Sequence, residues 1–415
     1  MFLAVYADAA GRIYEHPHVS LLGRSGNGWV EPLEEEMMPL PEGASLVSVP
    51  GFAPVGMNPD GSPAVLQEDL YGTPGRVQAI AALLPQGFTR TLLPACVAQN
   101  HQVMPLMGYA AVGFRDGQFW VAAVQSDEHR KWHPQFYNLD DLPERVEAML
   151  QRFPENRIVQ QIGHCSLEYN CFTAQNIFYQ RWEGGIPTFH KCNANCIGCI
   201  SESHMPTDSP QTRLMQLPSV EEVVELGSFH LEHAEEGIIS FGQGCEGDPS
   251  LNAVRLAPAI REIRKLTPKG TININTNAGY TEGLVKMIDA GLDAIRVTMF
   301  SAREDSYLHY HRPLNYTLQN VLQTIDYAKQ NGVRVSVNAL IFPGFSDRES
   351  ELTAWLDFVE KHHIDLFQLR NLNMDPDMLL KGLPDEEGLG ILTLLETLQG
   401  NCVQMELGSY THPVR

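Results

Sequence analysis

The sequence predicts an α/β protein in which a partial (β/α)6 TIM-like barrel follows a mixed α+β N-terminal domain. From about residue 186, short apolar runs alternate with amphipathic segments of ten or more residues. This alternation is typical of βαβ units and a parallel sheet. Residues 1–125 are instead rich in Gly and Pro, with short apolar runs. Functional residues are expected at the carboxyl ends of the barrel strands.

The barrel is expected to contain six strands with helices between them. The expected strands span residues 186–190, 237–241, 271–275, 294–300, 334–341 and 366–369. The expected helices span residues 220–233, 253–265, 282–289, 318–330 and 349–362. Two of these helices are preceded by a Ser-x-x-Glu capping box, Ser219 with Glu222 and Ser346 with Glu349, in which the two side chains satisfy otherwise unpaired N–H groups.

The N-terminal domain is expected to contain strands and helices, but its fold is not identified. Residues 107–124 predict a hairpin with a Gly-containing turn at 115–118. Helices are expected near residues 77–84 and over residues 142–153. The chain therefore divides into an N-terminal accessory domain (1–180), a barrel (181–376) and a C-terminal cap (377–415).

Composition limits the classes of partner. Hydrophobic residues make up 43% of the 415 residues and charged residues 19%, which is typical of a soluble globular protein. The net charge of −21 makes nucleic acid an unlikely partner, because such binding depends on Lys and Arg. We find no apolar stretch long enough to span a membrane and no signal peptide at residues 1–8, so a cytoplasmic location is expected.

Three of the eight cysteines lie within eight residues and form the pattern C-x3-C-x2-C, directly after the first expected barrel strand. Cys192, Cys196 and Cys199 can hold three irons of an iron–sulfur cube and leave the fourth iron without a protein ligand. The alternative is a zinc site, which needs a fourth ligand such as His190 or His204. The position of the three cysteines at the mouth of a β/α barrel favours the iron–sulfur cluster.

This cysteine pattern resembles the signature of the radical S-adenosylmethionine (radical SAM) superfamily, and the resemblance spans residues 181–376. It implies an enzyme with a [4Fe–4S] cluster on the three cysteines, to which SAM binds through the open iron. An electron from a donor such as flavodoxin or ferredoxin would cleave SAM to a 5′-deoxyadenosyl radical. The radical would abstract hydrogen from a peptide, protein or small-molecule substrate. One departure is Gly198, where many members have an aromatic residue, so that any adenine contact there would come from backbone.

The resemblance also implies a set of SAM-binding residues. Glu246, Gly247 and Asp248 align with a Gly-Gly-Glu-Pro-like turn after the second strand, with Asp in place of Glu. Further candidates follow the later strands, in the order Asn275, Ser301 (with Arg296 less certain), Asn338 and Arg370. Together with Gly198, these residues form the expected SAM site.

The remaining cysteines have weaker interpretations. Cys96, Cys165 and Cys171 could bind auxiliary metal, but free cysteines are usually small buried apolar residues, and that interpretation is favoured. Cys245 lies in the Gly-rich turn and is a candidate catalytic residue, as a hydrogen-atom donor or acceptor, or else a packing residue. The alternative for the whole chain is a zinc-binding or catalytically inactive interaction protein on a β/α barrel.

Overall fold

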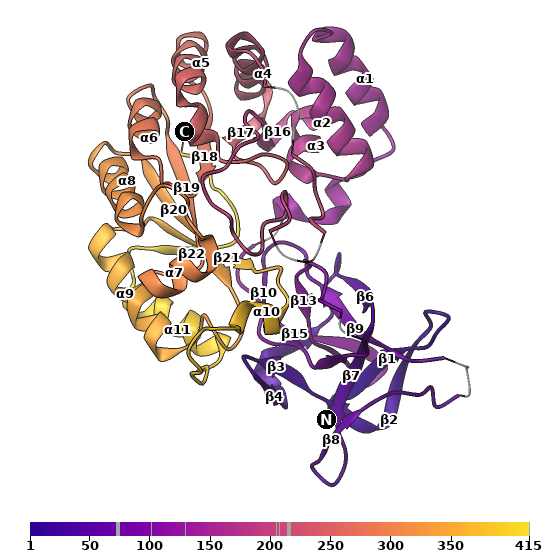
Figure 1. Ribbon diagram of the computed structural model, residues 1–415. Coiled ribbons are helices and arrows are strands. Elements are labelled where there is room, and N and C mark those ends of the chain that lie inside the picture. Colours follow the sequence, from indigo (N-terminus) through magenta and orange to yellow (C-terminus); the bar gives the residue numbers. More distant parts are fainter. Residues whose placement is uncertain are drawn as a thin grey trace.

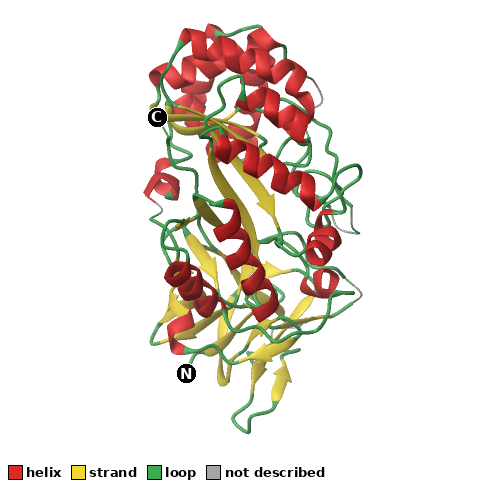
Figure 2. Cartoon of the chain, turned by 90° about the vertical axis from the view of Figure 1, so that its left-hand side faces the viewer, coloured by secondary structure: helices red, strands yellow, loops and turns green. Residues whose placement is uncertain are grey.

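The computed structural model describes residues 1–71, 75–100, 102–128, 130–204, 206, 208–213 and 217–414. Figure 1 shows a β-rich N-terminal part at the bottom and a parallel sheet with its helices above it. In the view turned by 90°, most helices gather over the upper sheet and most strands of the N-terminal part lie below (Figure 2). No helix in the described ranges combines the length and apolar character needed to cross a membrane.

The N-terminal part is built from antiparallel strands. They are β1 (Leu3–Ala7), β2 (Ile13–Leu21), β3 (Gly23–Ser25), β4 (Gly28–Val30), β5 (Met37–Pro39), β6 (Ser45–Val49), β7 (Phe52–Met57), β8 (Pro63–Val65), β9 (Gln78–Leu83), β10 (Phe88–Arg90), β11 (Leu93–Pro94), β12 (Cys96–Ala98), β13 (Tyr109–Ala110), β14 (Val112–Arg115) and β15 (Gln118–Gln125). The expected hairpin is confirmed: β14 pairs with β15 across Asp116 and Gly117, which both have positive φ, as a type I′ turn requires.

The helix expected near residues 77–84 is wrong, because this segment is strand β9. Its sequence is a continuous apolar run rich in Ala, and it pairs with β1, β6 and β13. The four central residues are all buried, so neither face shows the alternation that identifies a half-buried strand. Local periodicity therefore could not distinguish this strand from a buried helix.

Three helices connect the N-terminal strands to the barrel: α1 (Leu142–Arg152), α2 (Arg157–Glu168) and α3 (Phe172–Tyr179). The helix expected over residues 142–153 is confirmed by α1. Asn156 caps the start of helix α2, because its side-chain oxygen accepts hydrogen bonds from the N–H groups of Ile158 and Val159. Figure 1 shows the three helices beside α4 (Val220–His233), against the first strands of the barrel sheet.

The barrel is a curled sheet of seven parallel strands in sequential order, so the predicted partial α/β barrel is confirmed. The strands are β16 (Arg181–Gly185), β17 (Glu235–Phe241), β18 (Thr271–Thr276), β19 (Ala294–Met299), β20 (Arg334–Ile341), β21 (Leu366–Asn371) and β22 (Glu406–Gly408). The other helices are α5 (Ala253–Leu266), α6 (Thr281–Ile288), α7 (Glu304–His311), α8 (Leu318–Gln330), α9 (Glu349–His362), α10 (Pro376–Leu380) and α11 (Ile391–Asn401). The short 3-10 helices are η1 (Glu34–Glu36), η2 (Arg130–Trp132), η3 (Pro134–Phe136) and η4 (Pro249–Asn252).

Three details of the barrel differ from expectation. The sheet has seven strands rather than six, because β22 pairs with β21. The first strand is β16 rather than residues 186–190, because Pro187 has no N–H for a ladder and the N–H groups of Thr188 and Phe189 donate to the carboxylate of Glu246. The box at Ser219 forms as expected, whereas Ser346 accepts a hydrogen bond from the Phe342 N–H and caps no helix.

The N-terminal sheet is joined to the carboxyl end of β21. The Asn371 side chain accepts a hydrogen bond from the Arg90 N–H at 3.0 Å and donates to the Phe88 carbonyl at 2.9 Å. The buried Arg90 guanidinium donates to the carbonyls of Tyr109 and Leu372. These contacts place N-terminal loops over the strand ends where barrel active sites lie.

Candidate active site at the carboxyl ends of the barrel strands

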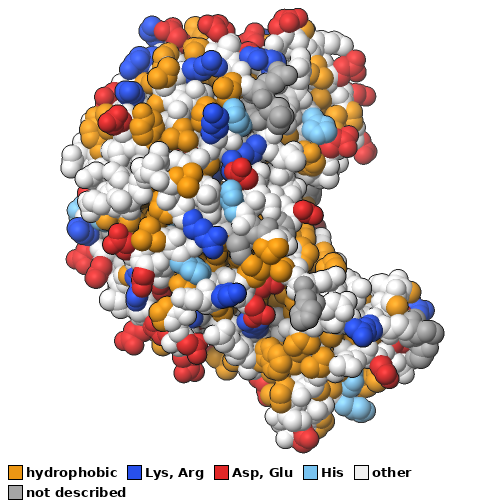
Figure 3. Space-filling view, viewed as in Figure 1, with side chains coloured by type: hydrophobic (Ala, Val, Ile, Leu, Met, Phe, Trp, Pro, Cys, Tyr) orange, Lys and Arg blue, Asp and Glu red, His pale blue; other side chains and the backbone are white. Residues whose placement is uncertain are grey.

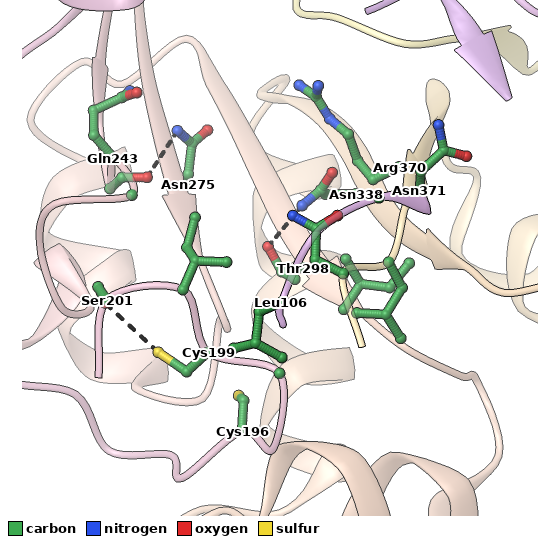
Figure 4. Close-up of a pocket in the computed structure, with 18 of the residues that line it drawn as sticks. Leu106, Cys196, Cys199, Ser201, Gln243, Asn275, Thr298, Asn338, Arg370 and Asn371 are labelled. Atoms are coloured by element: carbon green, nitrogen blue, oxygen red, sulfur yellow. Dashed lines mark hydrogen bonds between the residues drawn. The ribbon is translucent and has the colours of Figure 1, made fainter. Parts of the chain in front are cut away.

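A cavity of about 780 Å³ opens at the carboxyl ends of the barrel strands. Its wall combines the loop that carries the cysteine triad, the turn after β17 and polar side chains from β18 to β21. N-terminal residues 83–88 and 106–108 complete the lining. Figure 4 shows Cys196 and Cys199 at one side of this cavity, and Asn338, Arg370 and Asn371 across from them. The molecule is also hollowed between its upper and lower parts, at the right of Figure 3.

The structure brings the three cysteines of the triad together in the lining of this cavity. Their loop is held by backbone hydrogen bonds to the end of α7, from Asn195 to Arg312 and from Ile197 to Tyr310. Gly198 is required by packing, since a Cβ there would lie 2.8 Å from the Tyr310 hydroxyl. The ring of Tyr310 therefore leaves no room for the aromatic residue that many radical SAM sequences have at this position.

Burial makes free thiolates costly at this site. It raises the pKa of Cys192 to about 12, with the Asp248 charge as a further cause, and raises that of Cys196 well above its ordinary value. Metal binding would compensate, because thiolates are the form that binds metal. Each thiol has a side-chain nitrogen from elsewhere in the chain within hydrogen-bonding distance: Asn277 Nδ2 is 3.8 Å from Cys192 Sγ, His311 Nδ1 is 3.4 Å from Cys196 Sγ, and Arg213 Nη2 is 3.8 Å from Cys199 Sγ.

The donor set fits an iron–sulfur cluster better than zinc. Within the residues that the structure describes, no group of three His, Cys, Asp or Glu side chains is arranged to hold a single metal ion. Neither His190 nor His204 lines the cavity, and His204 instead pairs with Glu202 at 3.5 Å. A structural zinc ion needs a closed set of four ligands. A cube accepts each thiolate at a different corner, and hydrogen bonds to sulfur are among the features that tune such clusters.

The turn at residues 242–249 is held by its own two carboxylates. Glu246 accepts hydrogen bonds from four backbone N–H groups, those of Thr188, Phe189, Gly242 and Gln243, at 2.6–3.1 Å. Burial nevertheless raises the pKa of Glu246 to about 7. Its neighbour Gly247 packs so closely that a Cβ would lie 2.1 Å from the Lys191 carbonyl. The turn is therefore fixed against the segment that leads to the cysteine triad.

The Asp248 carboxylate also holds this region together through hydrogen bonds. Its carboxylate accepts hydrogen bonds from the Ser250 N–H and hydroxyl, the Thr276 hydroxyl and the Asn277 N–H, at 2.6–3.0 Å. Burial raises the pKa of this carboxyl. Because its oxygens are occupied by these donors, Asp248 ties the turn after β17 to the end of β18.

Polar side chains at the ends of β18 to β21 form the opposite wall. Asn275 accepts a hydrogen bond from Arg296 Nε at 2.7 Å and donates to the Gly242 carbonyl at 3.0 Å. Asn338 donates to the Thr298 hydroxyl at 3.1 Å, and its buried oxygen has no hydrogen-bond partner among the described residues. Figure 4 shows Asn275, Thr298 and Asn338 side by side along this wall.

Arg370 is the cationic side chain of this wall whose charge has no hydrogen-bonded or ion-paired partner among the described residues. Burial, with the nearby charge of Arg296 as a second cause, lowers its pKa to about 10. Arg296 itself forms an ion pair with Glu183 at 3.1 Å. In the described part of the chain, no hydrogen bond or ion pair involves the Arg370 side chain. A half-buried guanidinium of this kind is suited to a carboxylate or phosphate.

The structure gathers most of the expected site residues around one cavity. Gly198, Glu246, Gly247, Asp248, Asn275, Asn338 and Arg370 all line it, together with the triad. Ser301 does not: its hydroxyl donates to the Glu351 carboxylate and accepts a hydrogen bond from the Arg303 N–H. Its place at the end of β19 suggested an open hydroxyl, but helix α9 supplies a partner for it.

The three cysteines considered for an auxiliary metal site do not all come together. Cys96 is buried in strand β12 of the N-terminal sheet. Cys165 and Cys171 instead line a second cavity with Cys245. The sequence did not indicate that His311, Arg213 and Asn277 would lie near the triad as nitrogen donors, because nothing in their local sequence distinguishes them from other polar residues.

Comparisons with known proteins agree with this geometry. The family model described as the radical SAM superfamily matches residues 186–356. A GTP 3′,8-cyclase of Clostridium perfringens (strain SM101 / Type A) is 25% identical over 203 residues, 49% of this chain and 59% of that protein. One of Staphylococcus aureus (strain bovine RF122 / ET3-1) is 24% identical over 182 residues, 42% of this chain and 50% of that protein. The chain thus spans between half and three fifths of these curated relatives.

Solved structures of similar fold include a radical SAM methyltransferase from Sphaerobacter thermophilus, with 13% identity, a TM-score of 0.41 and coverage of 55% of this chain and 66% of that one. Methylornithine synthase has 13% identity, a TM-score of 0.37 and coverage of 65% and 76%. The segment that the family model matches contains the triad and the barrel strands β17 to β20. Residues 186–356 are thus a radical SAM domain, and members of that superfamily are enzymes that generally bind a [4Fe–4S] cluster and SAM.

Proposed function

We propose that this chain holds a [4Fe–4S] cluster on Cys192, Cys196 and Cys199 and cleaves SAM reductively to act on a further substrate. The observation that carries the proposal is the convergence of the three thiols on one cavity, each beside a nitrogen donor from another element. When bound, the cluster supplies one electron to SAM, which then gives methionine and a 5′-deoxyadenosyl radical. The electron would come from a donor such as flavodoxin or ferredoxin.

The residues of the cavity would bind and orient SAM. The backbone of residues 242–244 faces the cavity, and Glu246 and Asp248 hold this turn from behind. Asn338 offers an unpaired amide oxygen for a donor group, and Arg370 a guanidinium for a carboxylate. At Gly198 only backbone is available for contact, as the sequence led us to expect.

The N-terminal domain would cover the site. We propose the division into residues 1–180, 181–376 and 377–415, in which the first part supplies the loops at 83–88 and 106–108 to the cavity lining and the last part adds strand β22 to the barrel sheet. Covering the strand ends in this way excludes water, which protects a reactive radical from side reactions. These loops would also contact the substrate, which lies between them and SAM.

The test is SAM cleavage by the anaerobically reconstituted protein. We expect the parent chain to contain about four irons, as a single cube requires, and to form 5′-deoxyadenosine when reduced in the presence of SAM. Cys192→Ala should abolish both properties. Cys402→Ala is the matched control, because Cys402 lies after α11 and outside the cavity lining. A Cys192→Ala protein that still forms 5′-deoxyadenosine at the parent rate would refute the assignment, and a colourless zinc protein would support the alternative.

A further inference from the structure

Beside the SAM-site cavity lies a second cavity of about 400 Å³ that three cysteines line together. Cys165 comes from α2, Cys171 directly precedes α3, and Cys245 belongs to the turn after β17. All three are free thiols. The Cys171 N–H donates to the Cys165 carbonyl at 3.1 Å, which fixes the two segments together. The sequence suggested neither this grouping nor the part that Cys245 has in it.

The two cavities are neighbours with a shared wall. Gln243, Gly244, Arg296 and Arg370 line both of them. The second cavity therefore gives a small molecule access to thiols that are otherwise buried or half-buried. Cys245 faces this second cavity and is not part of the lining of the first. A thiol in this position is one residue away from Glu246, which fixes the turn.

Two of the three thiols form a polarised pair. The Cys165 and Cys245 thiols line the same cavity, and a hydrogen bond from Cys245 is the main cause that lowers the pKa of Cys165. Gln161 Nε2, 3.4 Å from Cys165 Sγ, and the adjacent His164 act in the same direction. The pKa of Cys245 rises well above its ordinary value because of the same pairing and burial, with further contributions from Glu246 and Cys171.

Cys171 is placed differently. Its Sγ is 3.3 Å from the Thr173 hydroxyl, which in turn donates to Gln243 Oε1 at 3.2 Å. Cys171 therefore lines the same cavity with a partner of its own, and it provides a matched control for the other two cysteines. A thiolate with a neighbouring thiol is the arrangement that attacks a disulfide and then resolves the mixed disulfide.

We propose that Cys165 and Cys245 are a redox-active thiol pair that exchanges with small-molecule disulfides and ties the turn at residues 242–249 to helix α2 when oxidised. The Cys165 thiolate attacks one sulfur of the small disulfide and releases one small thiolate. Cys245 gives its proton to that thiolate, attacks the Cys165 sulfur and displaces the second small thiolate, which takes a proton from water. Two protein thiols are thereby oxidised to one disulfide, and the small disulfide is reduced to two thiols.

The consequence for the first cavity rests on the proposed function. Formation of the bond draws Cys245 toward α2, and the adjacent Glu246 accepts hydrogen bonds from two N–H groups of the turn, those of Gly242 and Gln243, and from those of Thr188 and Phe189. Because the backbone of this turn is the proposed contact for SAM, oxidation of the pair should weaken SAM binding. Packed elements with two discrete arrangements couple neighbouring sites in this way.

The first experiment tests the pair without reference to any cofactor. The protein is equilibrated anaerobically with graded ratios of oxidised to reduced glutathione, alkylated and mapped by mass spectrometry under non-reducing conditions. We expect a peptide cross-linked through Cys165 and Cys245, which persists in Cys171→Ser and is absent from Cys165→Ser and Cys245→Ser. The mapping of the parent chain decides the matter even if a variant fails to fold. Repetition in the variant Cys192→Ser/Cys196→Ser/Cys199→Ser makes the result independent of the cluster.

Two outcomes would overturn the pairing: no cross-link at any ratio, or a cross-link between Cys165 and Cys171. The second experiment compares SAM binding by the reconstituted chain before and after oxidation of the pair. We expect affinity to fall by about fivefold or more on oxidation, within the ordinary range of coupling between sites. Equal affinity in the two states would refute the link to the turn, whereas absence of SAM binding in both states would instead refute the proposed function.

Discussion

His311 offers a sharp test of how the candidate active site is held together. Its ring is buried, with 1% of its surface exposed, and burial lowers its pKa to about 3, so it is neutral at physiological pH. Nε2 accepts a hydrogen bond from the Phe300 N–H at 3.1 Å. The proton of the neutral ring must then be on Nδ1, which lies 3.4 Å from Cys196 Sγ. His311 therefore connects the end of β19 to the cysteine triad.

The substitution His311→Leu keeps a side chain of similar size but makes it apolar and removes both hydrogen bonds. It leaves the Phe300 N–H buried without an acceptor, which costs about 1–3 kcal/mol. It also removes a donor to a cluster ligand. Hydrogen bonds to sulfur stabilise the reduced, more negative form, so we expect the reduction potential of the reconstituted cluster to become more negative.

Two measurements check this reasoning. Urea unfolding of the chain should show a lower midpoint for His311→Leu at an unchanged slope, and a potentiometric titration followed by EPR should show the change in potential. The control is His309→Leu on the same helix, where His309 Nε2 contacts the Leu379 carbonyl and not the triad. His309→Leu should leave the potential unchanged. If His311→Leu matched the parent chain in both midpoint and potential, the assigned hydrogen bonds would be wrong.

Three further predictions follow from the same site. Arg370→Met should keep the iron content and weaken SAM binding by about 1.5–3 kcal/mol, as measured by calorimetry, because it removes a charge-assisted hydrogen bond; unchanged affinity would show that SAM does not use this residue. Burial raises the pKa of Glu246 from an ordinary 4.5 to about 7. Between these pH values the folded chain holds a proton that the unfolded chain has lost. The contribution of Glu246 to stability therefore falls as pH rises through this window. Glu246→Gln should remove that part of the pH dependence of the unfolding midpoint and should lower stability most where Glu246 is ionised, since an amide oxygen cannot replace a carboxylate that accepts all four backbone N–H bonds; a pH dependence identical to that of the parent would contradict the assignment. The variant Cys192→Ala/Cys196→Ala/Cys199→Ala should contain essentially no iron or sulfide after reconstitution, because Cys96 lies apart from Cys165 and Cys171; stoichiometric metal, lost again on Cys165→Ala, would place an auxiliary site at the second cavity.

Local sequence patterns were sufficient to predict much of the barrel. The helices at residues 220–233, 318–330 and 349–362 begin and end where the sequence predicts, since amphipathic periodicity and chain breaks act over a few residues. The spacing of the triad is equally local, and it identified the family. Prediction failed where a segment is buried on all sides, as in β9, or where a distant group takes up backbone N–H groups, as Glu246 does at Thr188.

The sequence by itself therefore determined the fold class, the position of the triad and the end of the barrel at which the site lies. Tertiary structure decided which groups surround the triad, because His311 is 115 residues from Cys196, and Asn277 is 85 residues from Cys192. It also decided that Asp248 binds backbone and hydroxyl groups within the chain, and that Cys165 lines a cavity with Cys245 rather than with Cys96. Spacing along a loop constrains neighbours a few residues apart, whereas contacts between distant segments depend on how strands and helices pack.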